Sequence, residues 1–180
     1  MKKVFILCLL VLCLTGCITH KKSIPAVAHK SVSVETNNVS LANNVKTKKS
    51  DILFTLDIPK INLKKGIYGF DNKKNNVNYN IELLKESTLP GEGISHIFLA
   101  AHRGNSKVSF FEELNQLKEG DLVKIYYNNK TYEYKISYFF LTDKDGTISV
   151  NLEENTDSIG LITCVKNKKD KQIVYISYKI

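Results

Sequence analysis

The chain has 180 residues, 43% of them hydrophobic and 24% charged, and this mixture excludes a fully disordered, collagen-like or coiled-coil protein. The length fits one ordinary domain with a tail. The formal net charge is +8, but residues 51–180 hold 18 basic and 17 acidic side chains, so the basic excess lies before them. A domain that binds nucleic acid gathers basic residues on its folded surface, and we therefore expect no nucleic-acid partner.

The first 17 residues have the pattern of an export signal. Two Lys residues precede an uncharged apolar run at 4–14, which is shorter than the about 20 residues of a membrane span. The run leads into the tetrapeptide LTGC at 14–17, which resembles the lipobox of bacterial lipoproteins and thereby implies diacylation of Cys17. The alternative is an uncleaved or differently cleaved signal with Cys17 as an ordinary apolar residue. Both interpretations predict a domain outside the cytoplasmic membrane.

Residues 18–50 form a basic segment without periodicity or aromatic residues. We interpret it as a flexible stalk that holds the following domain, residues 51–180, off a membrane surface with anionic lipids. Of the four Cys residues, two fall in the signal and Cys17 is the lipidation candidate. Cys164 therefore remains as the free thiol of the predicted domain.

The first part of the domain reads as strands and loops. Alternating apolar residues at 54–58 predict a strand, and residues 61–67 predict a second short strand. An Asn- and Lys-rich loop is expected at 71–79, a helical turn at 81–84 and a further turn at 89–93.

The middle of the domain combines a buried strand, a short helix and a hairpin. The nearly continuous apolar run at 96–101 predicts a strand buried on both faces. Ser109 and Glu112 have the spacing of a capping box, which predicts the start of a short helix. The segments 122–127 and 132–141 flank an Asn-rich turn and predict a β-hairpin.

The last part adds a turn at 145–146 and two strands at 159–163 and 173–180, separated by a charged loop at 165–171. Seven or eight short strands with one or two small helices indicate a mainly β fold, a closed barrel rich in antiparallel strands.

Two residues with reactive side chains stand at the ends of predicted strands. His102 follows the buried strand at 96–101, and Cys164 ends the strand at 159–163. A Cys attacks carbonyl groups as its thiolate, and an imidazole accepts or donates the proton. Either residue alone is more commonly structural, but their joint occurrence in an exported chain favours catalysis.

The two blocks around these residues resemble the sortase family, the extracytoplasmic Cys transpeptidases of Gram-positive bacteria. The blocks are IFLAAHR at 97–103 and LITC at 161–164, and the spacing of the helix, turn and strand between them is also similar. The resemblance covers roughly residues 52–180. It implies an eight-stranded sortase β-barrel with His102 and Cys164 as the catalytic pair.

The sequence departs from the family pattern at three points. Ala101 and Gly160 replace a Gly and a Thr of the two blocks. The family also carries an essential Arg on the strand after the Cys, where this chain has Gln172 preceded by Lys171. Gln172 offers a neutral donor and Lys171 a point charge in place of this Arg, so reduced activity is a second expectation. The chain's single Arg, Arg103, is expected in a surface ion pair, with entry into the site as the alternative.

No cofactor or metal is expected. Some sortases bind Ca²⁺ through acidic loop residues, and four carboxylates lie in comparable loops: Glu86, Glu92, Glu153 and Glu154. They lack a regular spacing of oxygen ligands, so we expect solvated side chains there.

The resulting hypothesis is a sortase-like transpeptidase, lipid-anchored through Cys17 at the outer face of the membrane. Cys164 would cleave a C-terminal sorting signal of a surface protein through a thioacyl enzyme, and His102 would serve as general acid and then base. The acceptor would be an amine of a cell-wall precursor or a pilin-like subunit. The alternatives are a weak or inactive sortase-fold lipoprotein that binds peptides, and a Cys peptidase that releases its product to water.

Overall fold

The domain is built from eight β-strands and two short 3-10 helices in a computed structural model that describes residues 51–91, 93–144 and 147–180. The strands are β1 (Ile52–Ile58), β2 (Leu63–Tyr68), β3 (Glu82–Leu83), β4 (His96–Ala100), β5 (Leu122–Tyr127), β6 (Lys130–Asp143), β7 (Ser158–Val165) and β8 (Lys168–Lys179). The helices are η1 (Pro59–Ile61) and η2 (Glu112–Gln116).

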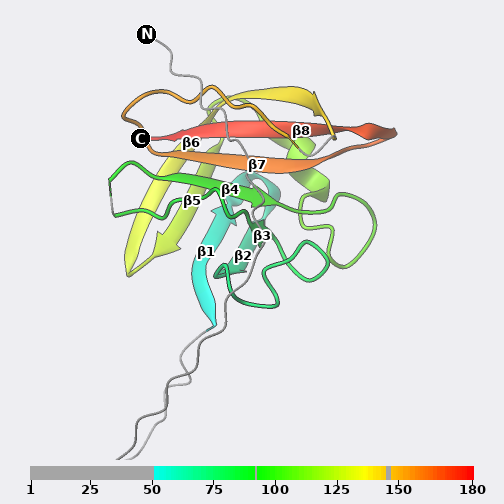
Figure 1. Cartoon of the computed structure of the whole chain (residues 1–180). Coiled ribbons are helices and arrows are strands. Elements are labelled where there is room, and N and C mark those ends of the chain that lie inside the picture. The colour runs from blue at the N-terminus through cyan, green and yellow to red at the C-terminus, as the bar shows by residue number, and fades with distance from the viewer. Residues whose placement is uncertain (1–50, 92, 145–146) are drawn as a thin grey trace, which may run out of the picture. The chain divides into compact units, whose positions relative to one another are not determined.

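The strands form one sheet that curls into a nearly closed barrel (Figure 1). Their order is β2-β1-β5-β6-β8-β7-β4-β3, and all neighbours are antiparallel except β4 and β7, which are parallel. The edge strands β2 and β3 lie beside each other, and the side-chain amide of Asn80 donates a hydrogen bond across this seam to the Gly66 carbonyl (2.8 Å). The prediction of a mainly β, eight-stranded barrel with one or two short helices is confirmed.

Apolar residues are buried on both faces of the sheet around β7 and β8. Leu161 and Tyr175 belong to the interior core of the barrel, whereas Ile162 and Val174 belong to a second, smaller cluster on the outer face. Part of the segment between β6 and β7, residues 148–152, packs on this outer cluster. Because side chains alternate along a strand, this division determines whether each residue near Cys164 points into the barrel or lies on the outer face of the sheet.

Two predicted elements of the first half differ from the structure. The helical turn expected at 81–84 is instead the short strand β3, because Glu82 and Leu83 pair with β4. The strand expected to be buried on both faces, β4, buries Ile97 and Leu99 but leaves His96 and two further residues partly exposed. A strand beside the barrel seam is covered fully on one face only.

The capping box predicted from Ser109 and Glu112 does not form. The helix begins at Glu112 as a 3-10 helix whose cap residue, Phe111, makes no side-chain capping bond. The Glu112 carboxylate instead accepts a hydrogen bond from the Gly104 main-chain N–H. The Glu112 carboxylate thus anchors the loop that follows β4.

The hairpin of β5 and β6 is confirmed, and its two turn residues, Asn128 and Asn129, have the positive φ angles of 49° and 59° that a type I′ turn requires. The charged loop expected at 165–171 is wrong. β7 and β8 extend into that segment and leave a tight turn at Lys166 and Asn167, and the charged side chains from Lys168 to Asp170 are exposed although they belong to a strand.

Several sequence predictions lie outside the described residues: the signal at 1–17 with Cys17, the stalk at 18–50, Glu92 and the turn at 145–146. Within the part of the chain that the structure describes, no helix has the length and apolar character needed to cross a bilayer.

Candidate active site

The parallel pair of β4 and β7 brings His102 and Cys164 to the same end of the barrel. The strand β4 points to the right-hand side of Figure 1. The ladder pairs Ala100 with Ile162, and two residues further along each chain stand His102 and Cys164. The buried Thr163 hydroxyl donates to the main-chain carbonyl of the residue before the His (2.9 Å) and ties the two chains together. Because paired strands lie about 4.8 Å apart, this register places the main chains at His102 and Cys164 side by side.

Both side chains are accessible. His102 and Cys164 are half-buried, and Cys164 is a free thiol. Cys164 borders a pocket of about 310 Å³ whose walls are the loop 103–105, Glu112 and the turn 164–167. A substrate therefore has a route to the sulfur atom.

The His102 ring has a polar partner on a separate loop. Its Nε2 lies 3.3 Å from Oδ1 of Asn78. With the proton on Nε2, the ring donates to Asn78 and Nδ1 is left as a hydrogen-bond acceptor. The sequence interpretation treated 71–79 as a loop without a role and missed this residue.

The loop that carries Asn78 is held by its own Asn side chains. The Asn75 amide accepts from the Leu83 N–H (2.7 Å) and donates to the Leu83 carbonyl (3.0 Å), so it pairs with β3 like a strand residue. The Asn78 N–H donates to Oδ1 of Asn76 (2.9 Å). These bonds fix the loop against the barrel and thereby place the Asn78 amide beside the imidazole. Asn favours such local bonds to the main chain, which was the available sequence signal.

The two residues expected to replace the family's Arg are both engaged elsewhere. Gln172 is the cross-strand partner of Cys164 in the β7–β8 ladder. Its side-chain Nε2 donates to the main-chain oxygen of Asp143 on β6 (3.1 Å). Lys171, the next residue along β8, forms an ion pair with the Asp143 carboxylate. Both side chains are therefore drawn towards Asp143 on β6.

Arg103 does not form the surface ion pair expected for it within the described residues. It is half-buried on the wall of the Cys164 pocket, and its Nε is buried without a hydrogen-bond partner in the part of the chain that the structure describes. Burial raises the pKa of Tyr175 on β8, and the charge of Arg103 opposes this rise. The guanidinium thus lies close enough to β8 to act electrostatically on that strand.

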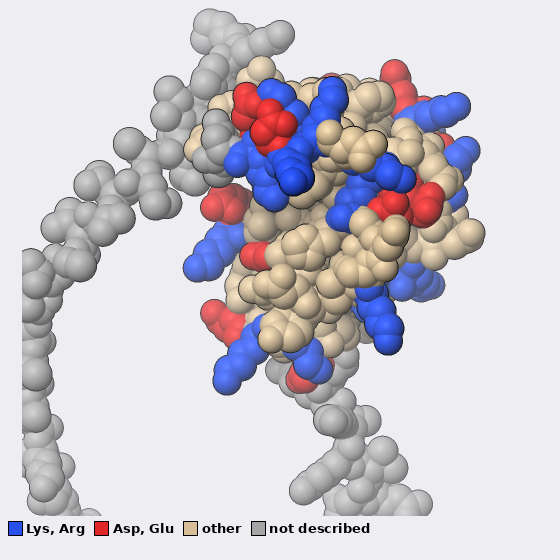
Figure 2. All heavy atoms as spheres, turned by 90° about the vertical axis from the view of Figure 1, so that its right-hand side faces the viewer, with Lys and Arg blue, Asp and Glu red and all other residues tan. Residues whose placement is uncertain are grey.

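Charged residues surround this end of the barrel, which faces the viewer in Figure 2. Lys and Arg gather in the upper part of this face around a few acidic residues. The basic side chains of the β7–β8 hairpin, Lys166, Lys168 and Lys169, are exposed.

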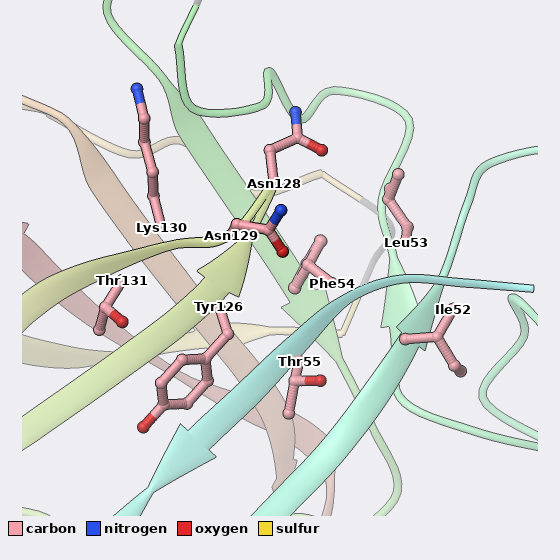
Figure 3. Close-up of a pocket in the computed structure, with 9 residues that line it drawn as sticks. All are labelled: Ile52, Leu53, Phe54, Thr55, Tyr126, Asn128, Asn129, Lys130 and Thr131. Carbon is pink, nitrogen blue, oxygen red and sulfur yellow. The ribbon is translucent and has the colours of Figure 1, made fainter. Parts of the chain in front are cut away.

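A larger hollow of about 540 Å³ lies elsewhere, between the start of β1 and the β5–β6 turn (Figure 3). Its lining combines main-chain groups with side chains such as Tyr126, Asn129 and Lys130, and shares no residue with the Cys164 pocket. The lining contains no His, Cys or carboxylate.

The described residues contain no group of three or more His, Cys, Asp or Glu side chains placed to hold a metal ion. Glu86, Glu153 and Glu154 are exposed and do not converge on one point. The calcium hypothesis thus has no donor set among them.

Comparison with known proteins agrees with this geometry. A model of the sortase domain matches residues 56–178. Sortase A of Bacillus anthracis is 27% identical over 129 residues, which cover 72% of this chain and 60% of that protein. The chain thus spans three fifths of the length of this relative.

Solved sortase structures have the same fold. Sortase A from Corynebacterium diphtheriae matches with a TM-score of 0.62 and 23% identity, covering 72% of this chain and 60% of that one. Sortase C1 from Streptococcus agalactiae matches with a TM-score of 0.62 and 26% identity, covering 74% of this chain and 70% of that one. With an eight-stranded barrel, a family model matched over most of the domain and these structural relatives, the chain belongs to the sortase family.

Proposed function

We propose that the protein is a cysteine transpeptidase of sortase type that acts at the outer face of the membrane of a Gram-positive bacterium, lipid-anchored through Cys17. Its donor substrate is the C-terminal sorting signal of a surface protein. Its acceptor is an amine of a cell-wall precursor or of a pilin-type subunit. The basic composition of residues 18–50 supports a tether beside anionic lipid.

One observation carries the proposal: His102 and Cys164 follow paired positions of two parallel strands and share an accessible end of the barrel. An imidazole next to an accessible thiol is the arrangement that nucleophilic acyl transfer requires. The chemistry needs no cofactor.

In the first half-reaction the thiol proton passes to His102, and the Cys164 sulfur attacks the peptide carbonyl carbon. A C–S bond forms while the carbonyl π electrons move to oxygen. When the oxyanion collapses, the C–N bond breaks and His102 gives its proton to the leaving amine. The product is a thioester at Cys164.

In the second half-reaction an incoming amine attacks the thioester carbon and loses a proton to His102. The C–N bond forms, the C–S bond breaks, and the thiolate recovers the proton from the imidazolium. Water in place of the amine gives hydrolysis, which is the Cys peptidase alternative.

The test follows acylation of Cys164 directly. The full chain is incubated in detergent with a library of internally quenched peptides, and intact-protein mass spectrometry detects the adduct. We expect an acyl adduct that is absent in Cys164→Ala, accumulates more slowly in His102→Ala and is discharged faster by added amines. Peptide cleavage that is unchanged in both variants overturns the proposal.

A peptide-binding module is the second candidate, because Gln172 and Lys171 are both bonded to Asp143 and neither has the guanidinium of the family's Arg. Retention of a library peptide without any adduct at Cys164 would support this function. Adduct formation that is not accelerated by amines would support the peptidase.

A further inference from the structure

The oxyanion of the proposed acyl transfer needs a hydrogen-bond donor near Cys164, and this inference rests on that proposed function. Loss of one such donor typically costs on the order of 10²–10³ in rate. The two candidate residues on β8 are already held by Asp143, since Gln172 donates to its main-chain carbonyl and Lys171 pairs with its carboxylate. A residue on another wall of the site is therefore the better source of the donor.

Arg103 lies on that wall and has donors to spare. It borders the same pocket as Cys164, and its Nε is buried without a hydrogen-bond partner among the described residues. None of the four ion pairs among the described residues includes it. An unpaired, partly buried guanidinium is costly unless a ligand satisfies it, and a buried carbonyl oxygen or oxyanion does so.

The main chain on both sides of Arg103 is held in place. The Phe111 N–H donates to the His102 carbonyl (3.2 Å), and the Gly104 N–H donates to the Glu112 carboxylate. Gly104 has a φ of 137°, which residues with a side chain rarely adopt. The loop is thereby anchored by η2, so the Arg103 side chain starts from a fixed position beside the catalytic pair.

We infer that Arg103 is a catalytic residue that donates hydrogen bonds to the carbonyl oxygen of the sorting peptide and to the oxyanion formed when Cys164 attacks. Arg103 thus takes the role of the family's β8 Arg, although it lies in the loop that begins at His102. A guanidinium suits this role because it stays charged and offers several donors in a planar fork. No proton leaves Arg103 in either half-reaction.

Lys166 is the other cation of the pocket and is the less suitable donor. Its side chain is exposed on the β7–β8 turn, where water screens a point charge. Arg103 is half-buried, so its electrostatic effect on a developing charge is larger.

The test measures single-turnover acylation of the full chain by the library peptide that the parent protein cleaves fastest. Arg103→Gln is expected to lower the acylation rate on the order of 10²–10³-fold, and Arg103→Lys, which keeps the charge without the fork, on the order of tenfold. Lys107→Gln is the matched control, because Lys107 is exposed in the same loop and its change removes one positive charge too. It is expected to stay within about threefold of the parent.

Two further measurements separate this inference from neighbouring explanations. Peptide binding should weaken less between Cys164→Ala and Cys164→Ala/Arg103→Gln than the acylation rate falls in Arg103→Gln, because the bond strengthens as the oxyanion forms. A merely structural role would instead lower the thermal midpoint. The double variant Arg103→Gln/Gln172→Arg places a guanidinium at position 172, the cross-strand partner of Cys164. We expect its acylation rate to be at least tenfold higher than that of Arg103→Gln.

The outcomes are distinguishable. If the parent protein is acylated and Arg103→Gln reacts as fast as Lys107→Gln, the assignment of Arg103 is wrong and the proposed function stands. If the folded parent protein forms no adduct with any peptide of the library, the proposed function fails and the inference falls with it.

Discussion

Nε2 of His102 lies 3.3 Å from Oδ1 of Asn78, although the two residues belong to loops on opposite sides of β3 and β4 in the sequence. A side chain that accepts from one ring nitrogen fixes both the tautomer and the orientation of an imidazole. Asn78 is therefore placed as a positioning residue for His102. The contact is exposed and at the long end of the hydrogen-bond range, so its contribution is modest.

Asn78→Ala should lower kcat of the proposed transfer about threefold to tenfold, because the net value of such a bond is about 0.5–1.5 kcal/mol. KM should change little, since Asn78 contacts the imidazole rather than the substrate. Steady-state kinetics with the best library peptide measure both constants. Asn115→Ala, on the exposed side of η2, is the matched control and should leave them unchanged. Equal constants in the two variants would show that Asn78 does not orient the ring.

Gln172 faces the same side of the sheet as Cys164 but serves the fold. Its amide bonds the main chain of β6, so Gln172→Ala should lower the free energy of unfolding by at most about 1 kcal/mol. The acylation rate should stay within about threefold of the parent, in contrast to loss of an oxyanion donor. Urea unfolding and single-turnover acylation test the two statements. A hundredfold slower acylation in Gln172→Ala would show that the hydrogen-bond donor to the oxyanion lies on β8.

The pairing of His102 with Cys164 illustrates what a single sequence predicts and what it does not. Each residue was recognisable at the end of an apolar segment, because strand signals are local. Their adjacency depends on the parallel register of β4 and β7, which joins residues 62 positions apart in the chain and leaves no local signal. Resemblance to the family supplied that link, and the structure supplies its physical basis.

The errors have equally specific causes. The spacing of Ser109 and Glu112 suits a capping box, but the carboxylate is bound by the Gly104 N–H, a tertiary partner that local pattern cannot show. The segment 81–84 has a helical pattern of apolar residues, yet β4 offers it a strand partner. Arg103 was expected in a surface ion pair because most Arg residues are exposed, whereas its loop turns it into the Cys164 pocket.

Gly160, where the family usually has Thr, is explained by its parallel partner on β4. Phe98 pairs with Gly160, and a Cβ built on Gly160 would lie 2.6 Å from Cδ1 of the Phe98 ring. Gly160→Ala should therefore lower the free energy of unfolding by about 1–3 kcal/mol, the usual cost of overpacking. Chemical denaturation measures the change.

The paired variant Gly160→Ala/Phe98→Leu tests the cause. A branched aliphatic side chain leaves room for the new methyl group, so we expect it to recover at least half of the stability lost in Gly160→Ala. Additive losses in the double variant would mean that the two side chains do not compete for the same space.

His96 links stability to pH. Its Nδ1 lies 2.9 Å from the Ser158 hydroxyl oxygen at the start of β7. Burial lowers the pKa of His96 from 6.5, and the charge of Asp157 opposes this only in part. Burial alone would raise the pKa of Asp157, but the Ser95 N–H and the Lys179 ammonium hold it below 3.8. The carboxylate therefore stays ionised above pH 5, where His96 is the group that responds.

Because the folded protein binds the His96 proton less readily than the unfolded chain, stability is fully present above pH 6.5 and falls as the pH drops through the lowered pKa. Urea midpoints measured from pH 5 to pH 8 should thus decrease on acidification. His96→Gln keeps a polar group for Ser158 without an imidazole, so its midpoints should depend less on pH across this interval. Parallel curves for the parent and the variant would assign the pH dependence to other groups.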